Sequence, residues 1–195
     1  MQLLKYPYFS LCKKINIHPN WISLLSLLPA LIAAVFIVKE SYLWAALLAS
    51  ISLIFDLLDG ACARLALKAS KFGDYIDALV DRYREVIFYF GFVLGGYPLE
   101  AFFALSGSLL ISFAKARAAM CVPIDDHDWP AIGDMADRNI VLIIGLIGAA
   151  IKPVWFLKYD LLTFVLLSIG LFTHIGCVFR IFYAKKIIEK KAPEC

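Results

Sequence analysis

The sequence is poor in charge and contains no long polar region. Only 18% of its 195 residues are Asp, Glu, Lys or Arg, whereas 62% are hydrophobic. Soluble domains average about 25% charged and about 45–50% apolar residues. The runs 21–38 and 161–179 contain no charged residue other than His174, and about 18 apolar residues are enough to cross a bilayer as a helix. The composition therefore excludes a soluble globular enzyme and predicts a multi-pass membrane protein.

Cysteine and histidine are also scarce. The five cysteines, at positions 12, 62, 121, 177 and 195, are far apart, and the three histidines have no metal-ligand spacing. We expect free thiols without a disulfide framework. The first twenty residues lack a compact apolar core, so we expect no cleavable signal peptide. The net charge of +3 does not indicate a nucleic-acid partner, and we expect none.

The apolar runs predict an all-α membrane protein with one domain over residues 1–195. Six spanning helices are expected at about 20–38, 41–66, 73–96, 98–120, 137–152 and 160–184, within a bundle covering 20–184. Residues 3–14 mix apolar and lysine positions, which predicts an amphipathic helix on the membrane surface within segment 1–18. Residues 185–195 are expected to form a polar tail.

Lysine and arginine are distributed unevenly between the two ends of these predicted spans. Six spans place both termini on one side, and 16 of the 19 basic residues fall on that side, leaving only Lys39, Lys152 and Lys158 on the other. Basic residues favour cytoplasmic loops. The sequence therefore predicts that the N- and C-termini are cytoplasmic. We expect the protein to reside in the plasma membrane of the cell.

Carboxylates are concentrated at one end of the second and third predicted spans. Asp56 and Asp59 are three residues apart, and Asp77 and Asp81 are four apart, so each pair shares one face of a helix. The connection between the two spans is short, which makes the helices antiparallel neighbours and lets the four side chains converge.

Such a cluster is expected either to be protonated or to be neutralised by cations. Each ionised Asp at membrane depth costs about 2.5–3.5 kcal/mol or more, and hard carboxylate oxygens favour Mg²⁺ or Mn²⁺. Two such ions can promote in-line attack on phosphorus. One alternative is a set of helix-end acids paired with nearby arginines. A metal- or proton-coupled transporter is another, because intramembrane acids also mark ion pathways; the absence of an internal repeat argues against it.

The run from Asp56 to Asp81 resembles a family signature. It reads Asp-x2-Asp-Gly-x2-Ala-Arg-x8-Gly-x3-Asp-x3-Asp and is similar to that of the CDP-alcohol phosphatidyltransferases. The resemblance implies a homodimer in the membrane lipid, with two Mg²⁺ (or Mn²⁺) on Asp56, Asp59, Asp77 and Asp81, and with Asp81 as general base beside Asp77. It also implies that the CDP part of the donor is held by Asn20, Trp21, Ile22, Ser23, Gly60, Ala63, Arg64, Ser70 and Gly73.

A second resemblance concerns the acceptor. Lys115-Ala-Arg117-Ala is similar to a segment of the phosphatidylinositol-phosphate and archaetidylinositol-phosphate synthase branch, which implies that Lys115, Arg117, Arg138 and Arg180 bind the acceptor phosphate. The implied reaction moves a lipid phosphate group from CDP-diacylglycerol or CDP-archaeol to a phosphorylated polyol, foremost 1D-myo-inositol phosphate. Of the branch's usual fifth-span motif only the pair Asp137-Arg138 is retained, so glycerol 3-phosphate stays open as the acceptor.

Overall fold

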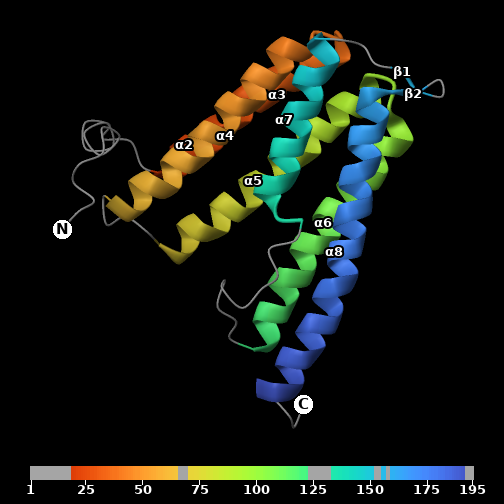
Figure 1. Cartoon of the computed structure of the whole chain (residues 1–195). Coiled ribbons are helices and arrows are strands. Elements are labelled where there is room, and N and C mark those ends of the chain that lie inside the picture. The colour runs from red at the N-terminus through yellow and green to blue at the C-terminus, as the bar shows by residue number, and fades with distance from the viewer. Residues whose placement is uncertain (1–18, 66–69, 123–132, 152–154, 157–158, 192–195) are drawn as a thin grey trace. The chain divides into compact units, whose positions relative to one another are not determined.

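The architecture is almost entirely helical. A computed structural model describes residues 19–65, 70–122, 133–151, 155–156 and 159–191 of the chain (Figure 1). Its elements are α2 (Pro19–Leu25), α3 (Leu27–Val38), α4 (Tyr42–Leu65), α5 (Lys71–Leu94), α6 (Pro98–Cys121), α7 (Met135–Ile151), β1 (Trp155–Phe156), β2 (Tyr159–Asp160) and α8 (Leu161–Lys191). The chain divides into two compact units, Met1–Gly91 and Phe92–Cys195.

Among the described helices, four segments are long and apolar enough to cross a membrane, at 20–38, 42–60, 98–121 and 161–191. This confirms the expected all-α membrane fold. The remaining two predicted spans correspond to α5, which carries several charged residues, and to α7, which has 17 residues. The predicted surface helix at 3–14 lies outside the described residues.

In the first unit, α2 and α3 together form the first predicted span and pack against α4 (Figure 1). The helix is interrupted at Ser26 because Pro29 has no N–H to donate to the carbonyl of residue 25. The Ser26 hydroxyl donates to the Ser23 carbonyl over 2.6 Å, and the Ser52 hydroxyl of α4 donates to the Ser26 carbonyl over 2.7 Å. The hydrogen bond from Ser52 therefore links the break between α2 and α3 to α4.

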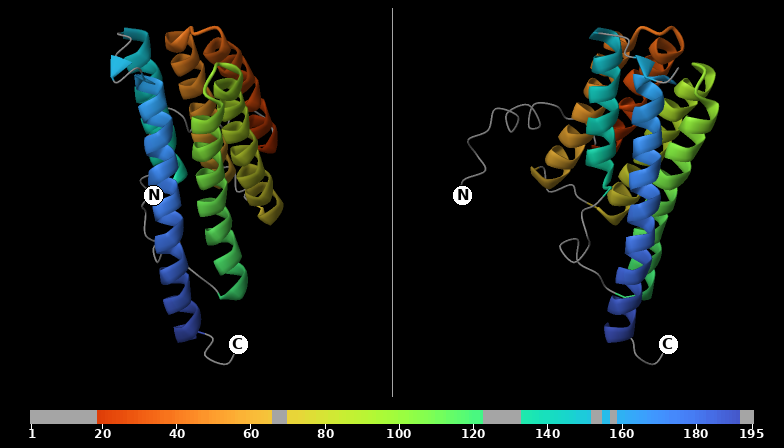
Figure 2. Two further views of the ribbon diagram at one scale, coloured as in Figure 1. Left: turned by 90° about the vertical axis from the view of Figure 1, so that its right-hand side faces the viewer. Right: turned by 45° about the vertical axis from the view of Figure 1, so that its right-hand side comes forward.

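In the second unit, α8 packs against α6 and α7 (Figure 2). A Cβ at Gly107 would collide with Thr173, and one at Gly170 would collide with Phe103, so glycine lets α6 and α8 approach closely. Asp160 caps the start of α8, because its Oδ1 accepts hydrogen bonds from the Thr163 N–H (2.9 Å) and hydroxyl (3.0 Å). The Tyr97 hydroxyl donates to the same carboxylate. Two-residue strands pair antiparallel, with Trp155 opposite Asp160.

The last helix is longer than predicted. The sequence predicted a span ending at residue 184 and a tail at 185–195, whereas α8 continues to Lys191. Helix-forming lysine and glutamate residues follow the apolar run, and Lys185 pairs with Glu189 at 3.7 Å one turn further on. Local helix propensity therefore extends the element past the expected membrane boundary.

Candidate active site

Three of the four signature aspartates converge in the first unit. Asp56 and Asp59 lie one turn apart near the end of α4, and Asp77 lies near the start of α5. Each offers a carboxylate oxygen, and these oxygens all lie within 4.8 Å of one another. Asp59 is buried, with 2% of its surface exposed. The helix spacing thus brings together three of the four acids that the sequence predicted to converge.

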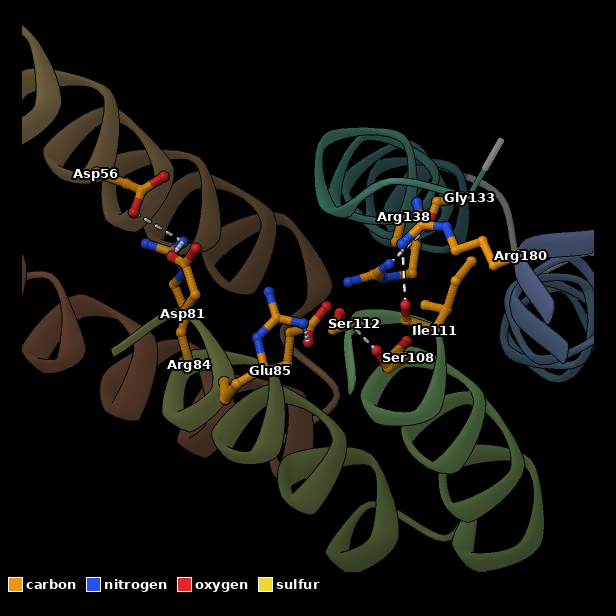
Figure 3. Close-up of polar contacts among 11 residues, drawn as sticks. Asp56, Asp81, Arg84, Glu85, Ser108, Ile111, Ser112, Gly133, Arg138 and Arg180 are labelled. Atoms are coloured by element: carbon orange, nitrogen blue, oxygen red, sulfur yellow. Dashed lines mark hydrogen bonds and ion pairs between the residues drawn. The ribbon is translucent and has the colours of Figure 1, made fainter. Parts of the chain in front are cut away.

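Asp81 joins this cluster through an arginine. The Arg84 guanidinium, which is fully buried, places Nη2 3.0 Å from Asp56 Oδ1 and 2.5 Å from Asp81 Oδ1 (Figure 3). One nitrogen therefore connects Asp56 of α4 with Asp81, the last acid of the signature. Arg84 offsets a single negative charge in a group of four carboxylates.

The donor set fits divalent cations. All four side chains supply hard carboxylate oxygens, which Mg²⁺ and Mn²⁺ prefer. Asp59 accepts a hydrogen bond from Ser23, yet its Oδ2 is buried and has no hydrogen-bond partner among the described residues. A buried carboxylate oxygen in this condition is costly unless a proton or a cation satisfies it. Asp56, Asp59, Asp77 and Asp81 would hold such ions.

Some of the predicted donor-binding residues also lie together. The Ser70 hydroxyl accepts a 3.0 Å hydrogen bond from the Gly73 N–H. A Cβ at Gly73 would lie 3.2 Å from Ser70 Oγ and 3.4 Å from Asn20 Oδ1. Asn20, Ser70 and Gly73 therefore lie close together, and Ser23 contacts the acid cluster through Asp59.

The other predicted donor-binding positions differ in their placement. Trp21 is exposed, with 62% of its surface accessible, whereas Ile22 is buried against Cys62. Gly60 is half-buried beside Asp59. Ala63 and Arg64 belong to α4, but their side chains lie outside the described part of the chain.

Cys62 corrects an expectation from the sequence. It is disulfide-bonded, so the prediction that every cysteine is a free thiol is wrong for this residue. The prediction is confirmed for Cys121 and Cys177, which are free. Wide sequence spacing does not report the distance between thiols in the folded chain, which decides pairing.

In the second unit, two of the predicted acceptor-binding cations are buried at one place. Arg180 of α8 donates from Nη1 to the Ile111 carbonyl (2.9 Å) and from Nη2 to Asp134 Oδ1 (2.5 Å), and Arg138 Nη1 donates to the Gly133 carbonyl (2.6 Å) (Figure 3). Arg138 and Arg180 are 5% and 3% exposed. Gly133 and Asp134, the two residues that precede α7, thus bind Arg138 and Arg180 respectively.

The remaining two predicted cations are less enclosed. Lys115 is half-buried on α6. Arg117 is exposed, and its Nη1 lies 3.7 Å from Met120 Sδ on the same helix. Of the four predicted acceptor-binding residues, the structure therefore brings Arg138 and Arg180 together around residues 133–134.

Arg84 and Asp134 are the polar residues that the sequence did not single out for the site. Arg84 follows Asp81 by three residues, a spacing that pairs equally well in an exposed helix-end network. Asp134 belongs to the stretch in which the branch motif is altered. Burial of Arg84 and the pairing of Asp134 with Arg180 distinguish them, and both depend on packing between elements.

Comparison with known proteins defines the class. Residues 16–182 match the family described as CDP-alcohol phosphatidyltransferase. The chain belongs to this family and is a transferase of the membrane, in agreement with the signature from Asp56 to Asp81.

Relatives that resemble most of the chain include two archaeal enzymes. The archaetidylinositol phosphate synthase of Methanothermobacter thermautotrophicus is 32% identical over 165 residues, covering 83% of this chain and 82% of the relative. The archaetidylinositol phosphate synthase of Pyrococcus horikoshii is 27% identical over 179 residues, covering 90% and 87%.

The fold is also found in solved structures. The Mycobacterium tuberculosis phosphatidylinositol phosphate synthase with CDP-DAG bound has a TM-score of 0.78 at 19% identity, with coverage of 91% of this chain and 93% of that one. The same enzyme in complex with manganese and citrate has a TM-score of 0.73 at 20% identity, with coverage of 92% and 88%. These likenesses establish the fold.

Proposed function

We propose that this chain transfers a phosphatidyl or archaetidyl group from a CDP-lipid to the hydroxyl of a phosphorylated polyol, foremost 1D-myo-inositol phosphate, with release of CMP. The observation that carries the proposal is the convergence of Asp56, Asp59 and Asp77, whose carboxylate oxygens lie within 4.8 Å of one another. The names of the archaeal relatives support an inositol phosphate acceptor. No observation favours glycerol 3-phosphate.

The acid cluster would hold two Mg²⁺ ions, with Mn²⁺ as a substitute. Asp56, Asp59, Asp77 and Asp81 supply the ligands, and the orphaned Oδ2 of Asp59 is the atom that most needs a cation. When bound, such ions neutralise charge on the donor pyrophosphate as CMP departs. The manganese complex of the mycobacterial enzyme of the same fold supports a divalent metal.

Residues around Gly73 would bind the CDP part of CDP-diacylglycerol or CDP-archaeol. A Cβ at Gly73 would lie only 3.2 Å from Ser70 Oγ and 3.4 Å from Asn20 Oδ1, so glycine lets the backbone lie close to these two polar side chains. The full proposed set is Asn20, Trp21, Ile22, Ser23, Gly60, Ala63, Arg64, Ser70 and Gly73.

Asp81 would act as the general base. It accepts the proton of the attacking acceptor hydroxyl while the new O–P bond forms and the P–O bond to CMP breaks. Its carboxylate is held in place by Arg84 Nη2 at 2.5 Å.

Lys115, Arg117, Arg138 and Arg180 would bind the acceptor phosphate. Arg180 already holds the Asp134 carboxylate, whose side chain is 48% exposed, so its guanidinium is oriented to receive an anion. Arginine donors suit a phosphate because their N–H groups match its oxygens.

We further propose a homodimer with six spans per protomer, one membrane domain, cytoplasmic termini and residence in the plasma membrane. The basic residues favour this orientation. It places Cys121, an exposed free thiol at the end of α6, on the cytoplasmic side. A membrane-impermeant maleimide should label Cys121 only after cells are permeabilised; labelling in intact cells would reverse the orientation. The mass of the protein in detergent, measured by light scattering, tests the dimer.

The acceptor is tested by CMP release from purified protein with Mg²⁺ and a CDP-lipid. We expect turnover with inositol 1-phosphate, and little with glycerol 3-phosphate, free inositol or serine. Arg138→Ala should raise the acceptor KM by about 10- to 100-fold, because a hydrogen bond to a charged group contributes about 1.5–3 kcal/mol, and should leave the donor KM nearly unchanged. Lys185→Ala, which removes an exposed cation from the end of α8, is the matched control.

Turnover with an uncharged or zwitterionic acceptor alone would exclude the phosphate-binding role of Arg138 and Arg180 while leaving the reaction class intact. Binding of metal without CMP formation from any acceptor would instead favour a metal- or proton-coupled transporter.

A further inference from the structure

Arg84 stands in an unusual environment for a helix arginine. Its side chain is fully buried, and its Nη2 contacts both Asp56 Oδ1 (3.0 Å) and Asp81 Oδ1 (2.5 Å). Its Nε and Nη1 atoms have no hydrogen-bond partner among the described residues. Burying a guanidinium with two unsatisfied nitrogens is costly, so the two ion pairs are what holds it there.

Those ion pairs involve only two of the four acids. The carboxylate oxygens that come within 4.8 Å of one another belong to Asp56, Asp59 and Asp77. Asp81, the fourth signature acid, is the one that Arg84 contacts most closely. Asp56 therefore belongs both to the group of converging oxygens and to the pair that Arg84 bridges (Figure 3).

We propose that Arg84 is a built-in counter-cation of this site, which competes with divalent cations for Asp56 and Asp81 and positions the Asp81 carboxylate. The inference rests on the proposed function, since it takes the four aspartates to be metal ligands. Arg84 is a positioning residue because it acts through the carboxylates.

Two physical effects follow from the position of Arg84. A fixed positive charge about 3 Å from two ligand oxygens repels an incoming dication, and this repulsion is strong where water is largely excluded. The same guanidinium also occupies lone pairs that the ion needs. Both effects weaken metal binding, so removing the charge should strengthen it. If Arg84 merely held the ligands in place, its removal would weaken binding instead.

The test is Mn²⁺ binding to purified protein without substrates, measured from the electron paramagnetic resonance signal of the free ion. We expect Arg84→Met to bind Mn²⁺ at least about tenfold more tightly than the unsubstituted protein, because Coulomb repulsion and competition both disappear. Arg84→Lys should stay within about threefold, because a single nitrogen makes both ion pairs and one ammonium can replace it.

Lys71→Met is the matched control for long-range charge. It removes one positive charge from an exposed position on the same helix and should change Mn²⁺ affinity by less than about twofold. If Arg84→Met is not recovered in monodisperse form, Arg84→Gln removes the charge while keeping a polar group and is measured in its place.

Unchanged or weaker Mn²⁺ binding in the charge-removing variant would overturn the inference, as would an equal effect of Arg84→Lys. Failure of the proposed metal centre gives a different result, because the unsubstituted protein would then bind no Mn²⁺ at all.

Discussion

Single aspartates decide the chemistry of this molecule because charge within a membrane helix is expensive. Each ionised Asp costs about 2.5–3.5 kcal/mol or more at membrane depth, and Asp59 has only 2% of its surface exposed. Ser23 and Arg84 satisfy part of the cluster, and in the proposed metal site a cation would satisfy the rest. Retaining four acids at this cost is typical of a functional site.

Replacing the proposed base should sharply reduce turnover. Asp81→Asn keeps the size of the side chain but cannot take up a proton, so we expect kcat for CMP release to fall by about 10²–10⁴-fold, the usual contribution of general base catalysis. Asp74→Asn makes the same change at an exposed position in the first turn of α5 and should retain activity. Equal activity of the two variants would remove Asp81 from the mechanism.

The sequence predicted the convergence of the acids because the spacing of each pair on its helix and the short connection between the helices leave little freedom. It did not predict the role of Arg84. An arginine three residues after an aspartate pairs with it whether the pair is exposed or buried, and only the packing of α4 against its neighbours places Arg84 beside Asp56 as well. Asp134 was missed for the same reason, since its partner Arg180 is 46 residues away.

At the scale of elements, the sequence predicted which segments are helical better than it predicted where the helices end or break. Apolar runs bounded by glycine, proline and charge located each described helix to within a few residues, apart from α8. The interruption at Ser26 was not predicted, since Pro29 in the first turn of α3 is compatible with a continuous apolar run. The disulfide at Cys62 depends on distances that spacing does not give.

The turn between α3 and α4 allows a prediction about stability. Glu40 has φ of 56°, and its N–H donates to the Ile37 carbonyl while the Ser41 N–H donates to the Phe36 carbonyl, both over 2.9 Å. A left-handed residue at a helix C-terminus is usually glycine, and a side chain there costs about 1–2 kcal/mol. Glu40→Gly should therefore raise the free energy of unfolding by about 1 kcal/mol, measured by thermal or denaturant unfolding in detergent.

Glu40→Ala is the control for this substitution. It removes the same carboxylate but keeps the Cβ, so we expect no comparable gain. A gain of equal size in both variants would assign the effect to the loss of charge and contradict the backbone explanation.

At the scale of the whole molecule, metal binding should be linked to folding. Ions that bind only the folded chain stabilise it by mass action, by about 2.7 kcal/mol at a hundredfold excess over Kd. We expect excess Mn²⁺ to raise the unfolding temperature of chelator-treated protein, and chelation to abolish CMP release. The Mn²⁺-dependent shift should be lost in Asp59→Asn and kept in Asp137→Asn, an exposed acid of the second unit. An undiminished shift in Asp59→Asn would place the metal elsewhere.

The central claim is that an acceptor hydroxyl attacks the phosphorus of a CDP-lipid. It is tested most directly with inositol 1-phosphate carrying ¹⁸O in its ring hydroxyls, with mass spectrometry of the lipid product and of CMP. The account predicts a phosphorylated inositol lipid that retains ¹⁸O and is formed in equal amount to unlabelled CMP. A lipid product that has lost one ¹⁸O, or CMP formed with no inositol lipid at all, would contradict it.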